Sequence, residues 1–200
     1  MKFFALFFAL TCLLTHSAFS HGKASRPPED VAREITFPDT ADYKTLVFDP
    51  HTHSVFSDGH VWPRIRVGEA LRDGLDAMAV TEHLEYQPHL EDIPHTDRNR
   101  SYNEAAAAAA GTDLMVIPGA EITRSAPASH MNAVFIQDAN KLYSVPASDT
   151  PYSPTEYRDL ANAWPAQNAV QAANDQGAFV FWNHSWWSPD FPNGIPVIPE

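Results

Sequence analysis

The sequence is almost devoid of cysteine: Cys12 is the single one among 200 residues. Cys12 lies in an N-terminal apolar stretch that we expect to be removed, which leaves the mature chain without a thiol. Disulfide bonds, thiolate metal sites and cysteine nucleophiles are thereby excluded. Any metal in this protein must be held by histidine, aspartate and glutamate side chains.

Positive charge is also scarce. Lys and Arg number 13 against 25 Asp and Glu, so the formal net charge is -12. A chain this acidic repels phosphate backbones and anionic lipid surfaces, and we therefore expect no nucleic-acid partner. A small-molecule substrate, even an anionic one, is compatible with this charge where local cations attract it.

The first twenty residues have the pattern of a secretory signal peptide. Lys2 precedes an apolar run at 3–14 that is shorter than the roughly 20 residues needed to span a bilayer. Ala18-Phe19-Ser20 supplies the small residues of a cleavage site. We expect a signal peptide at 1–20, with a membrane anchor as the alternative, and an exported protein, periplasmic or secreted, with no stable membrane anchor after cleavage. Residues 21–43, rich in Pro and charge, are interpreted as an N-terminal leader.

Short apolar runs alternate with helix-forming segments over the predicted domain, residues 44–200. The apolar runs predict five strands, at 45–48, 75–80, 114–117, 133–136 and 178–182. Helices are predicted at 63–73, at 98–110, which ends in six alanines, and at 154–177 with a break near Pro165. A low-complexity linker is the alternative for the alanines. This alternation predicts an α/β fold with a parallel sheet covered by helices, as a barrel or a doubly wound sheet.

Potential metal ligands gather where these predicted strands end. Because the carboxyl ends of parallel strands form one rim, ligands that follow different strands are expected to meet there. One further candidate, His130, lies just before the fourth predicted strand and can reach the rim from a connecting loop. The candidate ligands in chain order are His51, His53, Asp58, His83, Glu121, His130 and His184.

Each candidate also has a plainer interpretation. In a strand, His51 and His53 point to the same face and can bind one metal or two neighbouring metals, but a surface His-x-His is the alternative. For Asp58, simple Asp-Gly turn chemistry is the alternative, and for Glu121 it is an ion pair with Arg124. His83, His130 and His184 are ambiguous taken singly. Three further loop histidines are expected to be solvated: His60, His89 and His95.

The ordered set resembles a known family. His51-x-His53 with Ser57-Asp58-Gly59, then Thr81-Glu82-His83, Gly119-Ala120-Glu121, His130 and His184 resemble the PHP superfamily, the polymerase and histidinol phosphatase type of metal-dependent phosphoesterase. Each motif is weak by itself, whereas the ordered set is specific. The resemblance covers about residues 45–187.

What the resemblance implies is a distorted (β/α)7 barrel with up to three divalent metals at its rim. By resemblance, His51, His53 and Glu121 hold one metal, and Glu121, His130 and His184 hold a second, with Glu121 bridging. Asp58 and His83 contribute to a third. Family members also carry a late Asp-x-His, whereas only Asp190 follows His184 here. We therefore expect an incomplete barrel that lacks its C-terminal part, as a fragment of a longer chain, with a shortened form that has an incomplete site as the alternative.

Three functions are compatible with these residues. The first is a phosphoesterase that acts on a small phosphorylated molecule through a metal-activated hydroxide, with Glu121 and Arg124 as catalytic residues and Arg124 contacting phosphate. The second is an amidohydrolase-type enzyme that cleaves C–N bonds, although Lys44 and Lys141 are poorly placed for the bridging carboxylated lysine of that class. The third is a non-catalytic exported metal-binding protein. The expected cofactors are two to three divalent ions, zinc, manganese or iron.

Overall fold

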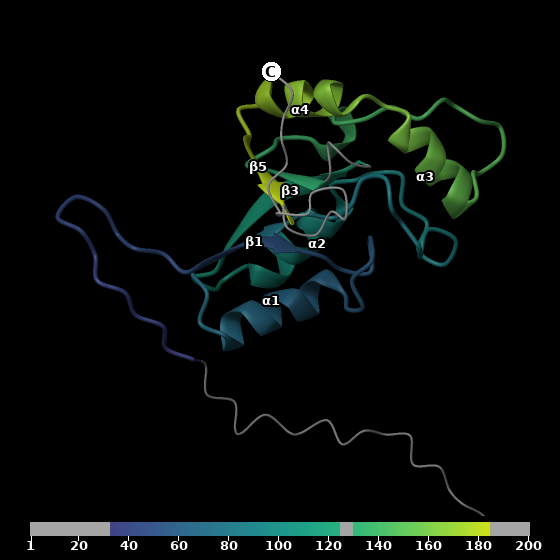
Figure 1. Cartoon of the computed structure of the whole chain (residues 1–200). Helices are drawn as coiled ribbons and strands as arrows, with labels where there is room; N and C mark the ends of the chain where they lie inside the picture. Colours follow the sequence, from purple (N-terminus) through teal and green to yellow (C-terminus); the bar gives the residue numbers. More distant parts are fainter. Residues whose placement is uncertain (1–32, 125–129, 185–200) are drawn as a thin grey trace, which may run out of the picture. The chain divides into compact units, whose positions relative to one another are not determined.

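The described part of the chain is built on one mixed sheet of five strands, in the order β1-β2-β3-β4-β5. The computed structural model describes residues 33–124 and 130–184 (Figure 1). The strands are β1 (Phe48–Thr52), β2 (Ala77–Val80), β3 (Met115–Thr123), β4 (His130–Val134) and β5 (Phe179–Asn183). The predicted signal peptide, most of the leader and the Pro-rich ending lie outside the described residues.

The expectation of a parallel sheet is correct for only part of it. β1, β2 and β3 run parallel, whereas β4 is antiparallel to both β3 and β5. The physical reason lies in the short connection between β3 and β4, residues 124–129, because a parallel crossover needs a dozen residues or more. The result is a curled half-barrel within an α/β fold, and the full seven-stranded barrel stays a prediction.

Two helices cover the β1–β3 part of the sheet. These are α1 (Pro63–Arg72), which begins at Pro63 as predicted, and α2 (Arg100–Ala109), which contains most of the alanine run. Ala105 and Ala109 are both buried, one helical turn apart, so they form the packing face of α2. The linker alternative for the alanines is thus wrong. Their cluster comprises Val67, Ala70, Met78, Val80, Ala105, Ala109 and Leu114.

A second cluster packs under β3 and β4. It includes Leu84, Ile122 and Leu142, and α4 (Ala166–Asn174) contributes Ala169 and Ala173. α3 (Pro154–Asn162) begins with a capping box between Ser153 and Glu156. The predicted break at Pro165 is confirmed, because α3 ends before it and α4 begins directly after it. A short 3-10 helix, η1 (Ala139–Lys141), joins β4 to the segment that precedes α3.

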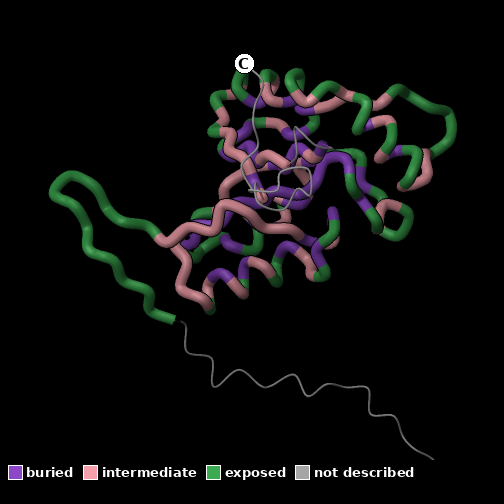
Figure 2. Tube along the Cα trace, in the orientation of Figure 1, coloured by how far each residue is buried: buried purple, intermediate pink, exposed green. Residues whose placement is uncertain are grey.

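Burial along the chain follows these two clusters. The buried strand residues lie mostly in β2, β3 and β4, whereas β1 is half-buried along its length and residues 33–46 are exposed throughout (Figure 2). Several strand boundaries differ from the prediction: β1 shares only Phe48 with the predicted strand at 45–48, and β4 begins three residues before the predicted strand at 133–136 and ends at Val134. β1 extends to Thr52 and β3 to Thr123, because ladder hydrogen bonds depend on the backbone and not on apolar side chains.

None of the helices in residues 33–124 and 130–184 has the length and apolar character needed to cross a membrane.

Leu142 offers a test of the second cluster, because its side chain is 0% exposed. We expect Leu142→Ala to lower the free energy of unfolding by about 2–5 kcal/mol, through lost burial and the cavity left behind. The matched control is Leu46→Ala, since Leu46 is 49% exposed and should lose less than about 1 kcal/mol. Urea unfolding of the two variants and the parent measures both effects. Equal losses would contradict the assigned core.

Candidate metal centre

All five strands of the sheet, or the residues that follow them, bring ligand side chains to one end of the sheet. His51 lies in β1 and His53 directly follows it, while Glu121 lies in β3 and His184 follows β5. A β-bridge between His83 and Glu121 continues the β2–β3 pairing beyond β2. His130 is the first residue of β4, and not a loop residue as expected. Because β4 runs antiparallel, its start lies at the same edge as the carboxyl ends of its neighbours.

Glu121 is the centre of the cluster, with a side chain that is 0% exposed. Its Oε2 atom lies 3.0 Å from Nε2 of both His51 and His53, and 3.4 Å from Nδ1 of His83. Its other oxygen, Oε1, lies 2.7 Å from Nδ1 of His130. The two carboxylate oxygens therefore face different sets of imidazoles. The alternative of an ion pair with Arg124 is wrong, since Glu121 has these histidine partners.

Asp58 and His184 extend the cluster on two sides. Asp58 Oδ2 lies 3.5 Å from His83 Nε2, and Oδ1 lies 3.8 Å from His53 Nδ1. The His184 ring centroid lies 5.2 Å from that of His51 and 5.8 Å from that of His130. His184 also has a backbone φ of 50°, in the left-handed region that a non-glycine residue rarely adopts. The structure thus brings all seven ligand candidates together.

The electrostatics of the cluster favour a negative Glu121. Burial raises the pKa of Glu121, but hydrogen bonds with His130, His51 and His53 outweigh it and hold the pKa below its ordinary value. The hydrogen bond with His83 lowers the pKa of Asp58 to about 2. Burial lowers the pKa of His184, which favours the neutral imidazole that binds metals.

The donor set fits divalent cations. His51 Nε2 and His53 Nε2 lie 2.8 Å apart, so these two atoms and Glu121 Oε2 form a nearly equilateral triangle. A six-coordinate ion with ligands about 2.1 Å away holds neighbouring ligand atoms about 3 Å apart. Three groups of ligand atoms lie within 4.8 Å of one another: His51, His53 and Glu121; His53, Asp58 and His83; and His83, Glu121 and His130. The shared members make a multi-metal centre geometrically possible.

Several supporting residues were not singled out from the sequence. Asn183 donates to Glu121 Oε1 at 3.4 Å and to Asn132 Oδ1 at 2.7 Å, and Asn132 donates to the Pro50 carbonyl at 3.1 Å. Both asparagines are buried. Thr123 Oγ1 lies 2.6 Å from His83 Nδ1 and so orients that ring. Asn132 lies directly before the apolar strand predicted at 133–136, and that position at the polar end of a strand was the signal available for it.

Glu82 has a structural position beside the candidate ligands. Its carboxylate accepts hydrogen bonds from the Ser54 amide at 3.0 Å, from the Ser57 hydroxyl at 2.5 Å and from the Ser54 hydroxyl. These bonds fix the turn that carries Asp58. Gly59 belongs to the same turn, where an added Cβ would lie 2.6 Å from the carbonyl carbon and oxygen of His53.

Arg124 is not brought together with the histidines. Its guanidinium is buried, donates to Glu85 and the Thr123 carbonyl, and reaches the Trp164 carbonyl at 2.7 and 3.0 Å. Lys44 and Lys141 are exposed, so neither supplies a bridging lysine. Of the three loop histidines expected to be solvated, His60 is exposed and His89 is half-buried, whereas His95 is buried, which corrects that expectation.

The comparisons with known proteins support the resemblance. No protein-family model and no curated protein matches the chain. Among solved structures, the chain is similar to a two-domain protein from Bacteroides vulgatus that contains a predicted PHP-like metal-dependent phosphoesterase. The two are 41% identical, with a TM-score of 0.67, over 83% of this chain and 43% of that chain. This chain thus spans less than half of that protein's length.

Two more distant structures were also found. One is a protein from Bifidobacterium adolescentis described as a metal-dependent phosphoesterase, at 29% identity over 50% of this chain and 31% of that chain, with a TM-score of 0.38. The other is an amidohydrolase from Chromobacterium violaceum with bound sulfate and no metal, at 19% identity over 65% and 50%, with a TM-score of 0.36. Of the three, the Bacteroides vulgatus protein alone is similar enough to inform this fold, and the resemblance to the PHP superfamily is confirmed.

Gly59 allows a test of the turn that carries Asp58. We expect Gly59→Ala to weaken divalent metal binding about tenfold or more, because the new Cβ must displace the His53 backbone. The matched control is Gly68→Ala on α1, where nothing lies within 4 Å and alanine should stabilise the helix by up to about 1 kcal/mol. Competition with a chelating indicator measures affinity for Mn²⁺ and Zn²⁺. Unchanged affinity in Gly59→Ala would contradict the placement of His53 and Asp58 at the metals.

Proposed function

On the premise of its resemblance to the PHP superfamily, we propose that this chain carries a metal-dependent phosphoesterase site for a small phosphorylated molecule, in an exported protein. The observation that carries the proposal is Glu121, whose two buried oxygens face separate groups of imidazoles. A carboxylate can bridge two cations, which an imidazole does not do. Phosphate-ester hydrolysis is a reaction that paired cations serve well.

The ligand roles follow the resemblance. His51, His53 and Glu121 would hold one ion, and Glu121, His130 and His184 a second. Asp58 and His83 would contribute to a third. Divalent ions bound there supply Lewis-acid charge that activates water and stabilises the negative charge developing on the phosphoryl group.

The surrounding residues prepare the site for this chemistry. Asn183 and Asn132 hold Glu121 in place, and Thr123 fixes the ring of His83. These bonds keep the ligand atoms positioned before a substrate arrives, so little reorganisation is needed during reaction. Because His184 is half-buried and Asp58 is exposed, the cluster is open to solvent on the side of Asp58. A small substrate can reach the ions from that side.

The first experiment replaces the bridging carboxylate. We expect Glu121→Gln to lose most bound metal and about 100-fold or more in phosphatase activity, since loss of even a supporting residue costs 10- to 100-fold. Glu104→Gln is the matched control, because Glu104 lies on α2, away from the candidate ligands, and is paired with Arg100. Elemental analysis gives the metal content, and p-nitrophenyl phosphate with added Mn²⁺ reports activity.

The same assay separates the competing functions. p-Nitroacetanilide offers the same chromophore on an amide, so its turnover in place of the phosphate ester would favour C–N hydrolysis. Two or more ions per chain without turnover of a wide panel of phosphate esters would favour the non-catalytic metal-binding protein. Either result would overturn the phosphoesterase proposal.

The predicted phosphate contact of Arg124 needs a separate test. Its guanidinium already binds Glu85 and the Trp164 carbonyl, and we expect Arg124→Lys to lower stability by about 1–3 kcal/mol with KM unchanged, because lysine cannot reproduce this fork. Urea unfolding and steady-state kinetics measure the two effects. A KM raised tenfold with stability intact would instead support the phosphate contact.

A further inference from the structure

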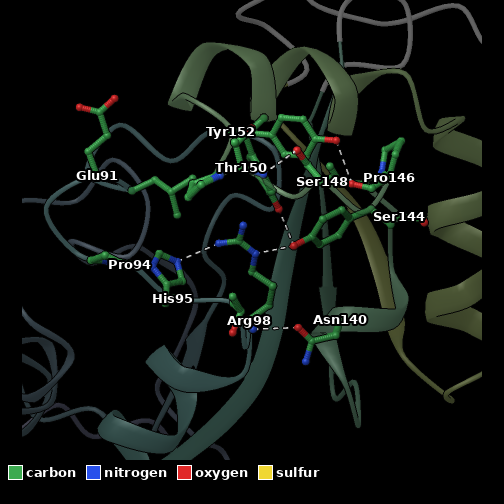
Figure 3. A pocket seen from close by; sticks show the side chains of 16 residues that line it. Glu91, Pro94, His95, Arg98, Asn140, Ser144, Pro146, Ser148, Thr150 and Tyr152 are labelled. Carbon is green, nitrogen blue, oxygen red and sulfur yellow. Dashed lines mark hydrogen bonds between the residues drawn. The ribbon is translucent and has the colours of Figure 1, made fainter.

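A separate pocket of about 860 Å³ lies between the loop of residues 84–99 and the segment of residues 142–153 (Figure 3). This volume is typical of small-molecule sites, which are mostly apolar with a few placed polar groups. None of the seven candidate metal ligands lines it. The pocket is therefore separate from the candidate metal ligands. Its lining residues determine what kind of molecule it can bind.

Arg98 is the cation of this pocket, and only 8% of it is exposed. Its guanidinium donates to the Tyr143 hydroxyl and to Gln87 Oε1, and its Nη1 atom lies 2.8 Å from His95 Nε2. The guanidinium carbon also lies 4.7 Å from the centroid of the Tyr157 ring. These partners are a hydroxyl, an amide, an imidazole and an aromatic ring. None of them is a carboxylate, so none balances the positive charge of Arg98.

His95 is indeed a neutral partner. Its Nδ1 lies 2.7 Å from the Ile93 carbonyl and must donate to it, which leaves Nε2 as an acceptor for Arg98. Burial lowers the pKa of His95, and the charges of Arg98 and Arg100 lower it further. The imidazole therefore accepts a hydrogen bond and adds no negative charge.

The other buried arginine shows what is missing around Arg98. Arg124 is 9% exposed and is paired with the buried carboxylate of Glu85. Among the residues that the structure describes, no carboxylate lies within 4.0 Å of Arg98, and its Nη2 atom has no hydrogen bond. Glu91 lines the pocket but points away from Arg98 (Figure 3). A buried charge without a counter-ion is costly, and an anionic ligand would remove that cost.

The remaining walls define the body of such a ligand. Pro94, Val145, Pro146 and the rings of Tyr152 and Tyr157 supply apolar and aromatic surface. The two N–H donors of Arg98 Nη2 remain for a ligand, and a guanidinium binds carboxylate, phosphate and phosphonate oxygens by charge-assisted hydrogen bonds. We propose that this pocket binds a small organic anion, with its carboxylate or phosphate group at Arg98 and an aromatic or apolar body against the tyrosines and prolines.

The test uses the full chain stripped of metal with a chelator, so its result is independent of the proposed phosphatase. Benzoate and phenylphosphonate are the two anionic probes, and neither is a hydrolysable ester. Benzyl alcohol has the same ring without the charge, and inorganic phosphate has charge without the ring. Titration calorimetry should show saturable binding of one or both probes, at least about tenfold tighter than either control compound.

Variants locate the binding. Arg98→Gln should weaken the better probe about tenfold or more, since it removes the charge. Ser148→Trp fills the pocket without touching Arg98 and should abolish binding, whereas Ala147→Trp, an exposed neighbour that does not line the pocket, should leave it unchanged.

Several outcomes would overturn the proposal. Absence of saturable binding of both probes up to about 10 mM would assign Arg98 a purely structural role. Binding that survives Ser148→Trp would place the probe elsewhere. If Arg98→Gln fails to fold, the comparison of Ser148→Trp with Ala147→Trp decides the matter.

Discussion

The buried carboxylate of Glu121 is the constraint on which the rest of this structure depends. Removing a charged carboxylate from water costs several kcal/mol unless partners replace the lost solvation. Here the partners are imidazoles from β1, from the residue after β1 and from β4, each within 3.0 Å of a carboxylate oxygen. Because a one-residue slip in a strand turns every side chain to the other face, these contacts require a fixed register of β3 against its neighbours.

The change of strand direction at β4 helps to meet that requirement. Residues 124–129 are too few to return the chain for a parallel strand, so β4 pairs antiparallel and starts beside the end of β3. Thr123 then faces His130 across the ladder, and Glu121 faces Asn132. The hairpin thereby places one ligand and one supporting amide next to the carboxylate. A parallel β4 would carry its start, and His130 with it, to the opposite edge of the sheet.

Local sequence signals were sufficient for much of the fold. The order of strands and helices, the start of α1 at Pro63 and the break at Pro165 all depend on residues close together in the chain. The gathering of the ligand candidates also followed from sequence, because the candidates near β1, β2, β3 and β5 occur where parallel strands end. The ordered resemblance then linked those positions to one family.

What the sequence did not reveal depends on contacts between distant residues. The direction of β4 is set by chain length between strands and not by strand propensity, and the asparagines that hold Glu121 come from two different strands. The burial of His95 was missed because a polar loop looks solvated until Arg98 and the ring of Phe56 pack against it. Likewise, no residue near Arg124 in the sequence indicates that its guanidinium will donate hydrogen bonds to the distant Glu85 carboxylate and Trp164 carbonyl.

The loop of residues 84–99 shows how such long-range polar contacts replace regular secondary structure. Gln87 receives a hydrogen bond from Arg98 and donates one from Nε2 to the His83 carbonyl at 3.3 Å, so its amide orientation is fixed from both sides. The Tyr143 hydroxyl accepts a hydrogen bond from Arg98 of the loop and another from the Tyr157 hydroxyl of α3 at 2.5 Å. Tyr143 thereby connects the loop to α3. A loop without helix or strand can therefore hold Arg98 at the pocket, and the neighbouring His83 at the candidate ligand cluster, in defined positions, because its buried polar groups bind one another.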